Sequence, residues 1–216
     1  MGDGAPSVAT RRRLPRGRHG LSREEVEGDQ RLRILVGVAE AMADGGYVGT
    51  PVAAILRSAG VSRETFYRLF PDKHTAYLAA FDLVGGVLLA ELDSAIAGPG
   101  DPLDPLDRVE RGLDRYLSTI AEHRAHARLF LVESYAAGAD AIARRHEVQE
   151  RITDALAALL GARSPSGRFA CQSVVATVSA LIVPPLVADD ADAIAALAPA
   201  VLAHVRRLYD AGVFAD

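Results

Sequence analysis

The feature that most constrains the fold is the segment from Thr50 to Lys73, in which two short apolar patterns flank a glycine turn. A threonine followed by a proline is typical of a helix start, and apolar residues at helical spacing follow it. Gly60 interrupts this pattern, and Ser62 can cap a second short helix. Two helices of about two turns each, joined by so tight a turn, are typical of a helix-turn-helix.

The remainder of the chain also favours helices over strands. Ser22 and Glu25 have the spacing of a capping box at the start of a first helix, and the segment 98–105 is a clear break. Because few runs combine β-branched with aromatic residues, we expect an all-α fold of about nine helices. Beyond the break, we expect helices at about 105–122, 124–137, 139–161, 168–183 and 191–211, with Pro184-Pro185 separating the last two.

In the two short helices of the helix-turn-helix, apolar residues lie on the face that points inward and polar residues lie on the outer face. The apolar set, which can pack the two helices against the first one, is Val52, Ile55, Val61, Phe66 and Phe70. The polar set near the start of the second helix is Arg63, Glu64, Thr65 and Arg68. The free N–H groups of a helix N-terminus favour phosphate, and an arginine can bond two acceptors on guanine. This segment therefore predicts a DNA-binding head.

The two parts of the chain differ in charge. Residues 1–73 carry a net charge of +3, whereas residues 74–216 carry −7. A basic segment joined to an acidic remainder suggests that only one end meets a polyanion. Residues 1–20 look disordered, and their arginines form either a solvated tail or, as we favour beside a helix-turn-helix, a DNA-contacting arm. These arginines are Arg11, Arg12, Arg13, Arg16 and Arg18.

The same region resembles the TetR family of bacterial regulators. The motifs that carry the resemblance are Ala43-Asp44-Gly45-Gly46-Tyr47, then Thr50, then Ala59-Gly60-Val61-Ser62-Arg63-x-Thr65-x-Tyr67, then Phe70-x-x-Lys73. The resemblance implies that Thr50, Tyr67 and Lys73 contact phosphates. It further implies base contacts from Arg63, Glu64, Thr65 and possibly Arg68, with Phe66 and Phe70 in the core.

Three parts of the chain are expected to have different roles: a basic arm at 1–20, a DNA-binding domain at 21–73 and a helical ligand-binding and dimerisation domain at 74–216. One recognition helix covers only a few base pairs, so we expect a homodimer through the last two helices, facing a palindromic operator. The resemblance implies that a small-molecule effector enters the C-terminal domain and releases a repressor from DNA. Candidate pocket residues are Tyr116, Phe130, Glu133, Tyr135 and Phe169, although core packing explains each of them equally well.

Other classes of function are weighed against this interpretation. A DNA-binding regulator without an effector fits the same motifs, whereas an enzyme or a carrier would need a constellation that the sequence does not display. His123 and His126 have helical spacing, but the pattern is too sparse to indicate a metal site, and no cofactor is expected. A lone cysteine fits a reducing, cytoplasmic location, and we expect neither a membrane span nor a membrane partner.

Overall fold

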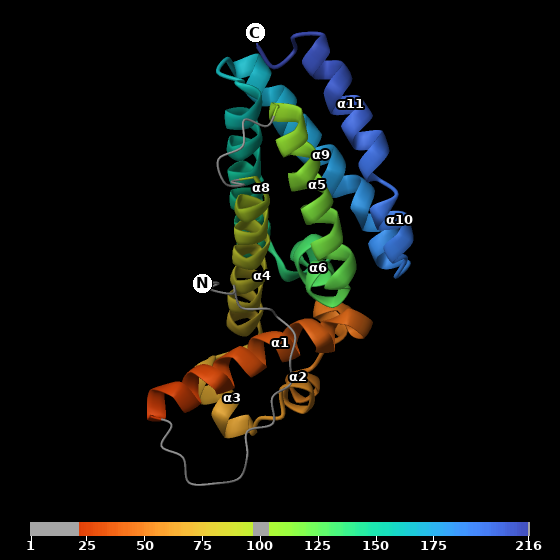
Figure 1. Ribbon diagram of the computed structural model, residues 1–216. Coiled ribbons are helices and arrows are strands. Elements are labelled where there is room, and N and C mark those ends of the chain that lie inside the picture. Colours follow the sequence, from red (N-terminus) through yellow and green to blue (C-terminus); the bar gives the residue numbers. More distant parts are fainter. Residues whose placement is uncertain (1–21, 97–103, 216) are drawn as a thin grey trace, which may run out of the picture.

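The computed structural model of the chain describes residues 22–96 and 104–215, and every regular element within these ranges is a helix. Figure 1 shows a small group of three helices at one end of a longer bundle. The three helices of this head are α1 (Arg23–Gly49), α2 (Val52–Ala59) and α3 (Arg63–Leu69). The body comprises α4 (Lys73–Ile96), α5 (Pro105–Glu122), α6 (Arg124–Leu131), α7 (Ser134–Ala137), α8 (Ala139–Leu160), α9 (Pro165–Val187), α10 (Ala191–Ala195) and α11 (Ala198–Asp210).

The first helix begins as its sequence predicts. The Ser22 hydroxyl accepts a hydrogen bond from the backbone N–H of Glu25 at 3.1 Å, and the Glu25 carboxylate accepts one from the N–H of Ser22 at 2.6 Å. This capping box satisfies N–H groups that have no partner inside the helix. Near its other end, Gly46 has a φ of 63°, a left-handed conformation that redirects the chain toward α2.

The core of the head forms where the inward faces of α1, α2 and α3 meet. Its central side chains are at most 1% exposed, and they are Ile34, Val38, Met42, Ile55, Phe66 and Phe70. Gly37 brings α1 and α2 together, since a Cβ atom built at this position would lie 2.8 Å from the backbone nitrogen of Ala59. The two helices approach so closely at this point that glycine, which has no side chain, is the residue that fits.

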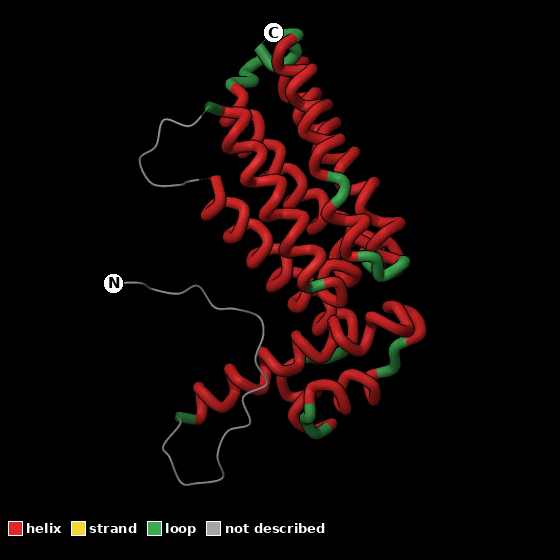
Figure 2. The backbone as a smooth tube through the Cα atoms, turned by 45° about the vertical axis from the view of Figure 1, so that its right-hand side comes forward, coloured by secondary structure: helices red, strands yellow, loops and turns green. Residues whose placement is uncertain are grey.

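The body is a bundle in which α4 links the two parts of the molecule. Figure 1 shows α4 in the bundle above the head, and Figure 2 shows the same two groups of helices from another side. Phe81 of α4 stacks on Phe130 of α6 with ring centroids 4.6 Å apart, and the buried Tyr77 hydroxyl donates to the Leu129 carbonyl at 2.9 Å. These contacts connect α4 to α6, which also packs on α1 of the head.

Three details of the expected helix boundaries were wrong. The helix expected at 124–137 is broken between α6 and α7, and the helix expected at 191–211 is divided into α10 and α11. Pro184-Pro185 lies inside α9 instead of ending it. A proline pair removes two N–H donors, whose partners four residues earlier would be Ala180 and Leu181. Both of these residues are exposed, so water can satisfy their carbonyl groups and the helix continues. The described residues therefore form eleven helices instead of about nine.

Two helices, α4 and α9, are long and apolar enough by length and composition to cross a membrane, with mean hydropathies of 1.5 and 1.8. Length and composition alone therefore do not distinguish these two helices from membrane spans. Each of them also contributes buried residues to the core of the bundle, which accounts for much of its apolar composition. Helix α9 differs from α4 in one respect: it has no charged residue from Phe169 to Val187, although part of this stretch is exposed.

Candidate nucleic-acid interface and effector cavity

Helix α3 presents a polar outer face because its apolar residues are committed to the core. Phe66 is fully buried, whereas Arg63, Glu64 and Tyr67 are exposed and Thr65 is half-buried. The Arg63 guanidinium lies 5.8 Å from the centroid of the Tyr67 ring, so the two side chains share one face. The structure thus brings together four of the residues that the sequence predicts for DNA contact.

The N-terminus of α3 is capped from within the motif. The Ser62 hydroxyl accepts a hydrogen bond from the backbone N–H of Thr65 at 3.0 Å and lies 3.0 Å from the Thr65 hydroxyl. Such a cap fixes the first turn of a short helix, which would otherwise fray. The residues at the start of α3 are therefore held in a defined orientation before any ligand is bound.

An arginine that sequence reasoning missed holds the turn of the motif. Arg33 of α1 donates to the Ala59 carbonyl through Nε at 3.0 Å and Nη2 at 2.8 Å, and it also contacts the Gly60 carbonyl. These carbonyls belong to the end of α2 and to the turn, where no intrahelical donor is available. Because 26 residues separate Arg33 from Ala59, no local sequence pattern indicates this contact.

Arg68 lies at the end of α3, but its guanidinium is directed toward α1. It donates to the Glu27 carboxylate at 2.9 Å and to the Gln30 side-chain oxygen at 2.7 Å. Both partners are charged or polar residues of α1, so Arg68 braces α3 against the first helix. In this structure the side chain does not share the outward orientation of Arg63.

Thr50 and Lys73, which the resemblance assigns to phosphate contact, are directed inward by the chain's own carbonyls. Thr50 is 2% exposed, and its hydroxyl donates to the Gly46 carbonyl at 2.7 Å. The Lys73 ammonium donates to the carbonyls of Tyr47 and Thr50 at 2.6 and 3.1 Å. Both side chains thus hold the junction between α1 and α2, where carbonyl groups lack helical partners.

A buried carboxylate from the body meets the same junction. Glu133, between α6 and α7, is 8% exposed, and it accepts a hydrogen bond from the backbone N–H of Tyr47 at 2.7 Å. A Cβ atom at Gly46 would lie 2.9 Å from Glu133 Oε2. Glycine is therefore required here for two reasons: its φ of 63° is left-handed, and a side chain would collide with the Glu133 carboxylate. The Tyr47 hydroxyl lies 3.2 Å from His74 Nδ1. Tyr47 is therefore held by His74 of α4 and by Glu133 from the segment between α6 and α7.

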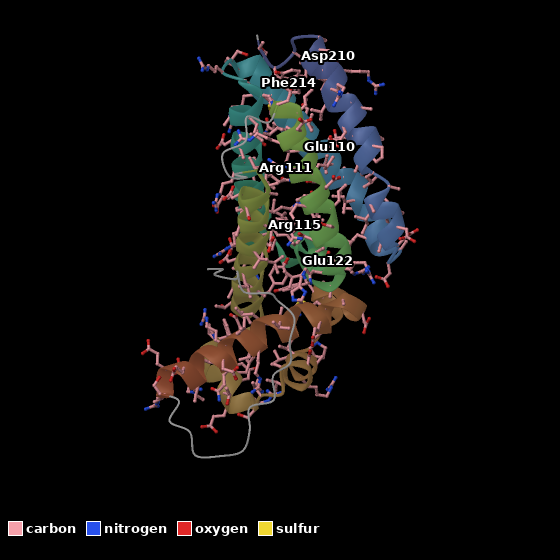
Figure 3. All side chains as sticks on the ribbon, in the orientation of Figure 1. Glu110, Arg111, Arg115, Glu122, Asp210 and Phe214 are labelled. Carbon is pink, nitrogen blue, oxygen red and sulfur yellow. The ribbon has the colours of Figure 1, made fainter. Side chains whose placement is uncertain are left out.

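An apolar cavity of about 90 Å³ lies in the body between α4, α5, α8, α9 and α11. Valine, leucine and isoleucine side chains form most of its wall, and Tyr116 and Ser179 are the polar residues that line it. Burial raises the pKa of Tyr116 to about 12, so its phenol stays neutral at physiological pH. Outside the cavity, Arg115 of α5, labelled in Figure 3, pairs with Glu91 of α4 at 2.6 Å.

Only Tyr116 among the five predicted effector residues lines this cavity. Phe130 is a core residue that stacks on Phe81, and Glu133 is committed to the head junction. Tyr135 and Phe169 are 67% and 68% exposed. The structure therefore does not bring these four positions to the cavity, because aromatic or acidic character on an apolar helix does not specify which way the side chain faces.

The arginines at positions 11–18 lie outside the described residues, as does Leu21, which precedes the capping box. Their expected contact with DNA therefore stays a prediction. Among the described residues of α3, Arg63 is the exposed basic residue that α1 does not engage.

Comparison with known proteins finds a family match in the head and at the start of α4. Residues 34–79 match the family described as bacterial regulatory proteins, tetR family. Over 123 residues, the chain is 28% identical to the HTH-type transcriptional regulator EthR of Mycolicibacterium smegmatis and 30% identical to EthR of Mycobacterium tuberculosis. The matched segment covers 56% of this chain and 54–55% of those proteins, so the chain spans about half the length of these curated relatives.

Solved structures extend the likeness to the body. The fatty acid degradation regulator FadR from Bacillus halodurans has a TM-score of 0.67 at 19% identity, and it covers 82% of this chain and 96% of its own. FadR from Bacillus subtilis, solved in complex with stearoyl-CoA, has a TM-score of 0.66 at 16% identity with the same coverage. At these identities the likeness shows a shared fold for the head and the helical body together.

Proposed function

We propose that this chain, whose residues 34–79 match the tetR family of bacterial regulatory proteins, is a sequence-specific DNA-binding regulator of transcription of that family, acting in the cytoplasm. The observation that carries this proposal is the outward polar face of α3, which displays Arg63, Glu64 and Tyr67 while Phe66 anchors the helix in the core. A short helix held this way fits the major groove, where base edges present a distinct pattern of donors and acceptors.

Each side chain on this face of α3 can make a hydrogen bond to a base edge or to a phosphate of DNA. We propose that Arg63 reads guanine, that Glu64 and Thr65 approach neighbouring base edges, and that Tyr67 bonds a phosphate. The engagement of Thr50, Arg68 and Lys73 within the protein supports a different role for them: Arg68 holds α3 against α1, and the other two hold the junction between α1 and α2. We propose that the basic arm adds an electrostatic contact with the DNA backbone through its arginines, which are Arg11, Arg12, Arg13, Arg16 and Arg18.

A homodimer that forms through the last long helices, α9 and α11, would place two copies of α3 on successive major grooves. Helix α9 supplies the strongest support, because its exposed residues form an uncharged stripe along one face of the helix. From Phe169 onward these residues are Phe169, Gln172, Ser173, Ala176, Thr177, Ala180, Leu181, Pro184 and Val187. A long uncharged face of this kind, with several apolar side chains, is normally covered in a stable protein, and a second copy of the same face is the symmetric solution.

We further propose that the regulator is a repressor and that an apolar effector releases it from a palindromic operator. The support is the cavity of about 90 Å³, whose wall is almost wholly aliphatic. The structural neighbour from Bacillus subtilis has a similar fold and was solved with stearoyl-CoA, whose acyl chain is aliphatic. Occupation of the cavity would favour a body arrangement that spaces the two heads poorly, with a coupling of about 1–3 kcal/mol being typical.

The DNA-binding proposal is tested by an electrophoretic mobility shift with the intergenic DNA beside the gene. Arg63→Ala is expected to weaken sequence-specific retention by about tenfold or more, because a bidentate arginine–guanine pair contributes about 1–3 kcal/mol of discrimination. Arg151→Ala, at an exposed position of α8 away from the head, is the matched control. Equal retention by the Arg63 variant and the control would remove the assignment of α3 as the recognition helix.

The dimer is tested by sedimentation velocity with Leu181→Glu. Leu181 is 44% exposed in the single chain, so a carboxylate there leaves the fold intact while burying a charge in the proposed interface. The expected result is a monomer with unchanged helix content. A dimer that persists at the same concentration would exclude α9 as the contact surface.

A further inference from the structure

We infer that Arg33 of α1 is a positioning residue for DNA recognition, which holds the backbone turn at Gly60 and thereby fixes the direction in which α3 displays Arg63. This inference rests on the proposed function and extends it to a residue outside the recognition helix. Figure 1 shows α1 crossing both short helices, so a side chain of α1 can reach the turn between them. The hydrogen bonds of Arg33 make this connection.

The Arg33 guanidinium bonds two successive peptide units of the turn. Its Nε and Nη2 atoms donate to the Ala59 carbonyl at 3.0 and 2.8 Å, and Nη2 also donates to the Gly60 carbonyl. These carbonyls belong to the two planar peptide units on either side of the Gly60 Cα atom. Because each residue has only two soft backbone dihedrals, a group that holds both units also restricts φ and ψ at Gly60.

Gly60 is the residue at which the chain turns from α2 toward α3. Its φ of 63° and ψ of 40° are left-handed, and only Gly60, Val61 and Ser62 separate the two helices. Glycine has more backbone freedom than any other residue, so a turn that depends on it needs a further restraint to keep one geometry. A Cβ atom at this position would lie 3.2 Å from Arg33 Nη2, so a side chain here would press against the guanidinium.

The chemistry of arginine suits this task. Its planar guanidinium presents N–H groups in a fixed arrangement, so one side chain can bond neighbouring carbonyls at once. The Nη1 atom of Arg33 lies 3.7 Å from a carboxylate oxygen of Asp29, one turn earlier in α1, which favours the same orientation of the group. A lysine ammonium is a point charge on a flexible stem. Arg33→Lys therefore keeps the charge and loses the fixed arrangement of donors.

The other contacts of α3 with the rest of the head lie beyond its first residue. Phe66 enters the core from the middle of the helix, and Arg68 bonds α1 near its end. Arg63 is the first residue of α3 and follows Gly60 by three positions. Binding groups work when they are held within about 10–20° of their productive orientation. The direction of Arg63 therefore depends on the turn, and through the turn on Arg33.

The effect on the turn is measured on the free protein by amide hydrogen exchange. The backbone N–H groups of Gly60 and Val61 donate to the Leu56 carbonyl at 3.0 and 3.3 Å, so they report on this turn. Arg33→Ala is expected to speed exchange at both amides by about fivefold or more, with a smaller increase in Arg33→Lys. Arg151→Ala, which removes the same charge from α8, should leave both amides unchanged. Wild-type exchange in Arg33→Ala would overturn the inference.

The effect on recognition is measured as a ratio of affinities, for the intergenic duplex beside the gene and for a shuffled duplex of the same length. Arg33→Ala should lower this ratio by about tenfold, with part of it restored in Arg33→Lys, while shuffled DNA is bound as tightly as by the wild type. A lost phosphate contact would instead weaken both affinities and reduce the salt slope by about one. Loss of folding would also weaken both, so either result would overturn the inference.

A double variant tests whether Arg33 acts through Arg63. Added to Arg63→Ala, Arg33→Ala should lower the ratio by about twofold or less, whereas independent contributions would multiply. A wild-type ratio in Arg33→Ala, or full multiplication in the double variant, would overturn the inference while Arg63→Ala alone still loses discrimination. A wild-type ratio in Arg63→Ala would refute the proposed function, and the inference with it, so the two failures are distinguishable.

Discussion

The head and the body of this molecule achieve a buried core in different ways. In the head, glycine lets α1 and α2 touch at Gly37, and side chains such as Arg33 and Lys73 bond directly to backbone carbonyls. In the body, long helices are held by aliphatic and aromatic side chains, and a cavity of about 90 Å³ remains between them. The comparison indicates a rigid head, suited to presenting α3 at a fixed angle, and a body with space for a ligand.

The contact between Gly37 and Ala59 provides the strongest test of close packing in the head. Gly37→Ala is expected to destabilise the protein by about 2–3 kcal/mol, since the new methyl group overlaps the backbone of α2. Gly28→Ala, in the same helix, is the control: no atom lies within 4 Å of its Cβ position, so the substitution should stabilise α1 by about 0.5–1 kcal/mol. Urea unfolding of both variants measures the two effects. The two substitutions should change the free energy of unfolding in opposite directions. A Gly37→Ala variant as stable as the wild type would contradict close packing between α1 and α2.

The junction between head and body is tested at Glu133. Glu133→Ala leaves the backbone N–H of Tyr47 without its acceptor, which should cost about 2 kcal/mol and speed hydrogen exchange at that amide. Glu133→Gln keeps an acceptor oxygen, so most of the stability and the amide protection should return. Exchange at Tyr47 that is equally slow in Glu133→Ala would show that another group protects this amide.

The same enlargement of valine to leucine should have opposite effects in the two regions. Val178 lines the cavity of the body, so Val178→Leu is expected to fill space and stabilise by up to about 0.8 kcal/mol, the value of one buried methylene. Val38 is fully buried in the head, where Val38→Leu should instead cost at least about 1 kcal/mol through overpacking. Calorimetric unfolding distinguishes the two cases. If Val178→Leu destabilises as much as Val38→Leu, the body is as tightly packed as the head.

The smallest expected effect concerns the pH dependence of the body. Burial, together with His123, lowers the pKa of His126 below its ordinary value of 6.5, while Glu40 opposes the shift. The unfolded chain therefore binds a proton at this residue at a higher pH than the folded chain, so the free energy of unfolding decreases as the pH falls below 6.5. His126→Gln removes this titration and should flatten the decrease between pH 6.5 and 5. An identical pH profile in wild type and variant would mean that the two states bind protons equally at this position.

Local signals predicted much of the head and of its polar face. The capping box at Ser22, the turn at Gly60 and the cap at Ser62 depend on residues within a few positions of one another, and the structure has all three. The inward and outward faces of α3 follow from helical periodicity, which places Phe66 in the core and Arg63 outside. The composition likewise favoured helices, and all regular elements in the described ranges are helical.

The sequence by itself thus determined the helices, their caps and the residues that α3 displays, because these depend on interactions within one or two turns. The tertiary structure alone decided how distant residues meet: Arg33 at the end of α2, Glu133 at Tyr47, and the aliphatic side chains around the cavity. It also directed Thr50, Arg68 and Lys73 toward the protein's own polar groups. The physical reason is that carbonyl and N–H groups at helix ends take whichever partner the packing brings near, and packing depends on the whole chain.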